Sequence, residues 1–193
     1  MDPTFQGRTP QVPYRRPGGR FNLSRRALLM IGGGLAILIV GFLLLAASGD
    51  KSGALQQRLS ARLATFSGIV AEGTNQIQSP DLREFNSRLS IQLLSDTASI
   101  NTALATAGMK SISKDITADE ADKASFDNLK TAALNSRFDD AYRTLVAQKL
   151  DSTMALMQEL YNETRSKSLK ASIDASYANL KQLENQLAAS TSS

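Results

Sequence analysis

The chain has 193 residues, with 22 lysines and arginines against 18 aspartates and glutamates, and it contains no cysteine, histidine or tryptophan. The absence of cysteine excludes disulfides and thiolate metal sites, and the absence of histidine removes the commonest metal ligand and the histidine-dependent nucleophile systems. We therefore expect a protein that is not an enzyme, without catalytic residues and without a bound cofactor or metal.

The basic charge lies at one end of the chain. Residues 1–26 carry six arginines and one aspartate, whereas residues 49–193 carry 16 basic and 17 acidic side chains. Residues 1–26 are also rich in proline and glycine and poor in apolar side chains, a composition typical of disorder. Because the remaining chain is close to neutral, no nucleic-acid partner is expected.

Residues 27–48 form an apolar segment without a single charged side chain. As a helix these 22 residues rise about 33 Å, enough to cross a hydrocarbon core of about 30 Å. This length predicts a transmembrane helix that contacts membrane lipid. A cleaved signal peptide is the alternative, because Ala46, Ala47 and Ser48 resemble a cleavage site. The apolar region of a signal peptide is usually about 7–15 residues long, which favours a retained anchor.

Arginines cluster on the N-terminal side of this apolar segment. An excess of lysine and arginine beside a span marks the cytoplasmic side, while Asp50 and Lys51 on the other side cancel each other. We therefore expect a single-pass protein of the cell (cytoplasmic or inner) membrane, with a disordered cytoplasmic arm and an extracytoplasmic C-terminal domain. The residues expected to set this topology are Arg15, Arg16, Arg20, Arg25 and Arg26.

The chain beyond the apolar segment has a helical pattern throughout. After a short joint at residues 49–53, apolar residues recur at spacings of three and four from residue 54 to residue 188, and no useful alternating strand pattern occurs. Long helices with apolar stripes and short connections predict an all-α fold, an antiparallel four-helix-type bundle. Residues 189–193 are small and mostly polar and are expected to form a flexible tail.

Local signals predict where the helices begin and end. A serine–proline pair at residues 79–80 predicts a helix start, and Gly108 predicts the end of that helix. A capping box at residues 117–120 predicts the start of a third helix. Further starts are expected at Ser136 and near Ser166.

One group of side chains stands out at the start of the fourth predicted helix. Phe138 and Tyr142 are four residues apart, so they face the same side and are expected to anchor the helix in the core. Asp139 lies at a capping position. A buried tyrosine hydroxyl needs a hydrogen-bond partner, so we expect a structural role for the group; ligand binding is the alternative.

The acidic residues do not follow a metal-binding pattern. Four acids lie between residues 115 and 122, but acids are expected in the first turn of a helix, and the glycine of a calcium loop is absent. A carboxylate-bridged di-metal centre uses Glu-x-x-His pairs, which a chain without histidine does not have.

Three motifs between residues 79 and 187 carry a resemblance to a known family. They are Ser-Pro-Asp-Leu-Arg-Glu-Phe at 79–85, Phe-Asp-Asp-Ala-Tyr at 138–142, and the helical stretch from Ser168 to Leu183. This part of the chain resembles a bacterial exported, ferritin-like helical domain of unknown function (DUF4142). The resemblance implies a ferritin-like bundle.

The chain departs from this family at positions where members commonly have histidine. The corresponding residues here are Thr97, which follows Asp96, and the two leucines Leu150 and Leu183. Any role that imidazole has in the family is therefore missing from this chain. The family's proline in the last helix is replaced by Ala178, which predicts a straighter helix.

These observations favour a membrane-anchored extracytoplasmic bundle that acts as a non-enzymatic interaction or structural protein of the cell envelope. Its expected partner is a second copy or another envelope protein. The alternatives are a module that holds a small apolar or cationic ligand between its helices and a degenerate ferritin-like metal protein. An enclosed cavity would favour a ligand, whereas a filled core with an exposed apolar patch would favour a protein partner.

Overall fold

A computed structural model describes residues 51–190 of the chain. The expected basic arm (residues 1–26), with its topology-setting arginines, and the expected anchor (residues 27–48) lie outside the described residues, as do residues 191–193. Among residues 51–190, no helix is both long enough and apolar enough to cross a membrane.

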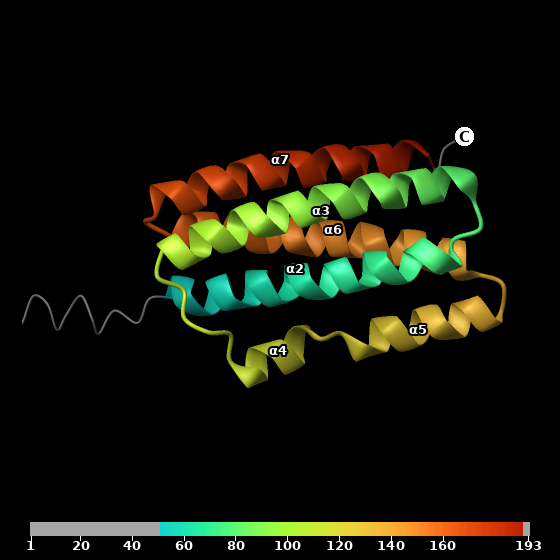
Figure 1. Cartoon of the computed structure of the whole chain (residues 1–193), viewed down its shortest axis with the longest axis horizontal. Helices are drawn as coiled ribbons and strands as arrows, with labels where there is room; N and C mark the ends of the chain where they lie inside the picture. The colour runs from blue at the N-terminus through green and yellow to red at the C-terminus, as the bar shows by residue number, and fades with distance from the viewer. Residues whose placement is uncertain (1–50, 191–193) are drawn as a thin grey trace, which may run out of the picture. The chain divides into compact units, whose positions relative to one another are not determined.

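The described part of the chain is built of helices, and it contains no strand (Figure 1). The four long helices are α2 (Lys51–Gln76), α3 (Pro80–Thr106), α6 (Phe138–Glu163) and α7 (Lys167–Ala189). The two short helices are α4 (Lys114–Glu120) and α5 (Lys123–Leu134). The predicted all-α class is thus confirmed for residues 51–190. Because α2 begins at Lys51, the last three residues of the expected joint are helical.

The four long helices form a bundle in which each packs against two neighbours. Both α2 and α7 pack against α3 and α6, so α3 and α6 lie on a diagonal of the bundle. Neighbouring helices are antiparallel, and α3 and α6 run in the same direction (Figure 1). The chain from residue 107 to residue 137, the crossover segment, therefore returns along the outside of α2 and α6, which α4 and α5 contact.

Three of the predicted helix boundaries are present. The Ser79 hydroxyl accepts a hydrogen bond from the Leu82 N–H, and Pro80 is the first residue of α3. At the other end of α3, Gly108 has a φ of +86° and the Met109 N–H bonds to the Leu104 carbonyl, a pattern that favours glycine. In the same way, the serine at residue 166 caps α7.

Two predicted helix starts are wrong. Helix α4 begins earlier than the expected capping box, because the Ser113 hydroxyl accepts from the Ile116 N–H, and Thr117 lies inside the helix with its hydroxyl bonded to the Ser113 carbonyl. Ser136 does not cap α6, because it has a φ of +57° and Arg137 occupies the cap position without a side-chain bond. At the first start a nearby serine takes the capping role, and at the second the backbone turn moves the cap by one residue, so the local pattern alone does not select the cap.

The core lies between the four long helices, and the crossover segment adds little to it. Its largest fully buried side chains come mainly from the long helices: Phe66, Leu59, Leu63, Ile69, Leu89, Leu93, Ile100, Leu104, Tyr142, Leu150 and Met157. The crossover segment has no buried residue in α4 and only Leu129 and Ala132 in α5. Ion pairs fasten it to the bundle, Glu120 with Arg62 and Arg58 and Asp122 with Lys149.

Candidate functional site

The aromatic pair expected at the start of α6 joins three helices. The rings of Phe138 and Tyr142 stack with centroids 5.7 Å apart, and Tyr142 is fully buried. The Tyr142 hydroxyl donates to the Asn86 side-chain oxygen on α3, and the Asn86 amide donates to the Thr74 hydroxyl on α2 at 3.4 Å. Burial raises the pKa of the Tyr142 hydroxyl, so it remains a donor. Its contacts join α2, α3 and α6.

Asp139 does not cap its own helix in the expected way. Its carboxylate oxygens accept the backbone N–H groups of Gln78 at 3.0 Å and Ser79 at 2.7 Å. These groups lie in the turn between α2 and α3, far from Asp139 in sequence. The Phe138, Asp139 and Tyr142 group therefore pins the start of α6 to the α2–α3 turn.

A second polar group connects α3 to α7. Asp96 is only 4% exposed, and its Oδ1 accepts hydrogen bonds from the side-chain amides of Asn179 at 2.9 Å and Gln92 at 3.1 Å. Burial raises the pKa of the Asp96 carboxyl; the two amide donors lower it, and the net effect is a raised pKa. Ser176, on the same side of α7, is also buried. This group ties two helices together but contains a single carboxylate.

The positions where the resembled family has histidine give no metal site here. Leu150 and Leu183 are buried in the apolar core, and Thr97 is partly buried beside Asp96. Within residues 51–190, no three acidic side chains come together in a way that could hold a metal ion.

Two of the four acids at residues 115–122, Glu120 and Asp122, form ion pairs with the bundle. Burial raises the pKa of Glu120, but hydrogen bonds from and the charges of Arg62 and Arg58 outweigh this effect and hold its pKa below the ordinary range. Burial also raises the pKa of Asp122, but the hydrogen bonds from Lys149 and Ser125 and the charge of Lys149 outweigh burial and lower the pKa overall. Both carboxylates are therefore ionised partners of basic side chains on the long helices.

One surface of α3 is exposed and uncharged. Its large side chains Ile91 and Leu94 are each 73% exposed, and they lie one turn apart on the same side of the helix. Between residues 90 and 106 the only charged residue is Asp96, which is buried. We call this surface the α3 face; its exposed residues are Ser90, Ile91, Leu94, Ser95, Ala98, Ser99, Thr102, Ala105 and Thr106.

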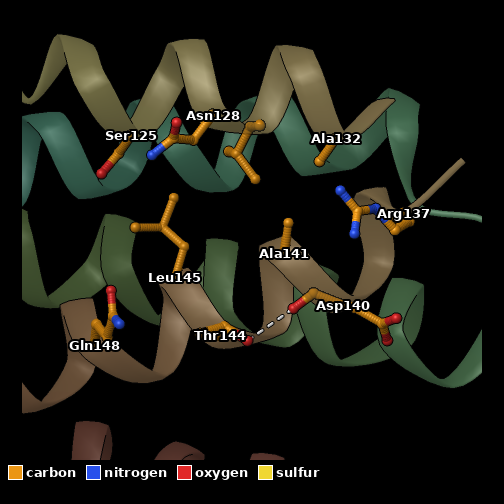
Figure 2. A pocket seen from close by; sticks show the side chains of 10 residues that line it. Ser125, Asn128, Ala132, Arg137, Asp140, Ala141, Thr144, Leu145 and Gln148 are labelled. Atoms are coloured by element: carbon orange, nitrogen blue, oxygen red, sulfur yellow. Dashed lines mark hydrogen bonds between the residues drawn. The ribbon is translucent and has the colours of Figure 1, made fainter. Parts of the chain in front are cut away.

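A groove of about 510 Å³ opens between α5 and α6. Its apolar part faces inward from both helices and consists of Leu129, Ala132, Ala141 and Leu145. Arg137 lies at one end of this α5–α6 groove (Figure 2). The remaining lining residues are polar and sit along the rim: Ser125, Asn128, Asp140, Thr144 and Gln148.

Sequence reasoning missed both surfaces, because each depends on which helix faces are left uncovered. Comparisons of the chain with protein-family models, with curated proteins and with solved structures found no match. The resemblance to the exported ferritin-like domain therefore stays a prediction. The two surfaces are the features of residues 51–190 from which a function can be argued.

Proposed function

We propose that the chain is a membrane-tethered bundle that works outside the cytoplasm by contact with a second copy of itself, and that the α3 face is the contact surface. The observation that carries this proposal is the exposure of Ile91 and Leu94 on a helix surface that exposes no charge between residues 90 and 106. The nearest exposed charges on this side of α3, Glu84 and Arg88, form an ion pair with each other. Exposed apolar patches of this kind are typical of protein interaction sites.

The filled core favours a protein partner over a ligand enclosed between the long helices. The apolar stripes of α2, α3, α6 and α7 meet in one cluster of buried side chains. The cavities found among the described residues are grooves between neighbouring helices, such as the one of about 170 Å³ between α2 and α3. A chain that fills its interior has its recognition chemistry on its surface.

The chemistry of the α3 face favours a second copy. Two identical charged faces would repel each other, but two α3 faces can meet without like-charge repulsion because residues 90–106 expose no charge and the adjoining Arg88 is paired with Glu84. The exposed residues that follow Leu94 on this surface are serine, alanine and threonine, whose small side chains let two helices approach closely. The shallow groove lined by Ser67, Val70 and Leu93 lies beside Leu94 and offers a recess for an apolar side chain of the partner. In a two-fold dimer each copy supplies both an exposed apolar side chain and a recess for the apolar side chain of its partner.

The anchor and the ferritin-like relationship belong to the same proposal. The support for the anchor is the apolar run at residues 27–48, which ends shortly before the first residue of α2. The support for a ferritin-like relationship is the single long crossover between two parallel long helices, a connectivity found in ferritin-like folds. No acidic cluster accompanies this connectivity in residues 51–190, so a metal function has no corresponding support.

Cysteine cross-linking in native membranes tests the proposal directly, because the chain has no cysteine of its own. We expect Ala98→Cys, on the α3 face, to give a disulfide-linked dimer under mild oxidation. The matched control Ala178→Cys, exposed on α7, should remain monomeric. Adding Ile91→Ser and Leu94→Ser to the first variant should abolish its dimer.

The size of the cross-linked product separates the outcomes. If Ala98→Cys stays monomeric while an unrelated protein with a known intermolecular disulfide is oxidised in the same reaction, the α3 face is not a contact between copies. A product of another mass would show that the face binds a different envelope protein. A dimer formed equally by Ala178→Cys would mean that proximity in the membrane, and not the α3 face, brings the copies together.

A further inference from the structure

We propose that the α5–α6 groove binds a fatty acid, with the carboxylate at Arg137 and the acyl chain along the apolar floor. This inference goes beyond the contact function of the α3 face, because it concerns other helices and a different class of partner. It rests on the shape of the groove, on the chemistry of its floor and on one unpaired charge at its end.

The shape and floor of the groove suit a linear apolar chain. Its volume of about 510 Å³ lies within the usual range of ligand pockets, roughly 300–1,000 Å³. The four floor residues recur at helical spacing along both helices, so the floor follows the seam between α5 and α6 (Figure 2). From Arg137 to Gln148 this seam follows 11 residues of α6, a rise of about 16 Å. The floor has no aromatic ring that would favour a flat ligand.

The head-group end of the groove carries an exposed arginine without an ion pair among the described residues. Arg137 is exposed, and its guanidinium makes no ion pair or hydrogen bond with a residue in the described part of the chain. It lies at the N-terminus of α6, where the helix dipole also favours an anion. The planar fork of a guanidinium matches the two oxygens of a carboxylate. A cationic ligand, which the sequence left open, is disfavoured here.

Neither acid beside Arg137 forms an ion pair with it. Asp139 is occupied by the backbone N–H groups of the α2–α3 turn. Asp140 lines the groove, but its carboxylate points away from the space between the helices (Figure 2).

The charges of the groove also define which end of a ligand lies where. Apart from Arg137 and Asp140, the rim residues are neutral hydroxyls and amides. The charges next to the far end at Ser125 and Gln148, Asp122 and Lys149, are paired with each other. A ligand that matches this arrangement has an anionic group at one end and a plain apolar chain behind it. A fatty acid has this composition, and a membrane-tethered protein would meet such molecules in the adjacent lipid.

Methyl NMR of the full chain in lipid nanodiscs tests the inference, with decanoate as the probe. We expect saturable shifts of the Leu129 and Leu145 methyl groups, with weaker binding of decanol and none of decylammonium. Arg137→Gln should raise the dissociation constant for decanoate about fivefold, the scale of an exposed ion pair. Arg165→Gln, an exposed arginine between α6 and α7, is the matched control and should leave it unchanged. Partitioning of decanoate into the lipid is the same for all variants.

A second variant tests the floor of the groove. Ala141→Leu places extra side-chain volume in the groove and should abolish the decanoate-dependent shifts, whereas Ala175→Leu, exposed on α7, should not. Circular dichroism checks that both variants are folded. If Ala141→Leu does not fold, Arg137→Gln and the series of three probes decide the question.

Several results would overturn the inference. Equal binding of decanol and decanoate, or a dissociation constant that Arg137→Gln leaves unchanged, would show that the carboxylate does not bind Arg137. If no shift is saturable, or if the methyl groups of Ile91 and Leu94 shift at lower decanoate concentrations than those of the groove, the fatty acid does not bind the α5–α6 groove. If the methyl signals of the groove shift when the protein concentration is raised without decanoate, the α5–α6 groove binds a second copy of the chain. None of these results alters the cross-linking expected of Ala98→Cys, so the two proposals fail independently.

Discussion

Replacing Gly73 by alanine tests how closely Tyr142 packs against α2. A Cβ atom at Gly73 would lie 2.7 Å from Cε2 and 2.8 Å from Cζ of the Tyr142 ring. Both distances are shorter than carbon atoms tolerate, and Tyr142 cannot move freely because its hydroxyl is bonded to Asn86 and its ring stacks on Phe138. The substitution therefore forces the Tyr142 ring, and with it the start of α6, to shift.

The size of the effect follows from two opposing contributions. Alanine is favoured over glycine in a helix by about 1 kcal/mol, which would stabilise the variant. Forcing additional atoms into a packed core costs about 1–3 kcal/mol. Gly68→Ala is the matched control on the same helix, because a Cβ there would meet only the Phe126 ring edge at 3.4 Å, an ordinary contact. We expect Gly73→Ala to be less stable than Gly68→Ala by about 1–3 kcal/mol.

Urea unfolding of the full chain, followed by circular dichroism at 222 nm, gives the free energies of unfolding of both variants. Gly68→Ala should be at least as stable as the native chain, and Gly73→Ala should not be. If both alanines stabilise the chain equally, Tyr142 does not pack against α2 as described, and it does not join the three helices.

Two further predictions concern acids that bind residues of other elements, Asp139 and Asp96. Asp139→Ala should lower the free energy of unfolding by about 1–2 kcal/mol, because the turn between α2 and α3 loses its acceptor; Asp140→Ala, the control, should have little effect in the same urea titration. Asp96→Asn should be about 1 kcal/mol more stable than the native chain at pH 7. Because the folded state raises the pKa of Asp96, the stability that its protonated carboxyl contributes is fully present below the ordinary carboxyl pKa and is lost as pH rises through the raised value. In Asp96→Asn this loss should be absent when unfolding is measured from pH 3 to pH 8, and an unchanged pH dependence would show that Asp96 does not titrate in this way.

The helices could be predicted from sequence where their signals are local. Ser79 followed by Pro80, and Gly108 in its left-handed conformation, each act through neighbouring backbone groups, so their residue types are sufficient. Thr117 and Ser136 carry signals of the same kind and were misassigned, since a nearby serine and a left-handed turn took the place of the expected caps.

The long-range contacts could not be predicted in the same way. Tyr142 was expected to find a hydrogen-bond partner, but Asn86 is 56 residues away and nothing in its local pattern marks it. The carboxylate of Asp139 was expected to serve its own helix and serves another. Such pairs depend on how helices are placed side by side, which the spacing of apolar residues within one helix does not specify.

The slight burial of the crossover segment has a consequence for how this protein can change in evolution. The segment has to bridge the length of a 26-residue helix, about 39 Å, which about 12 extended residues would cover. The real segment is much longer and contributes only Leu129 and Ala132 to the buried set, so most substitutions and many deletions in it leave the core intact. Its α5 also forms one wall of the α5–α6 groove. The groove can therefore diverge faster than the bundle, and related chains can share one scaffold while differing in what this wall accepts.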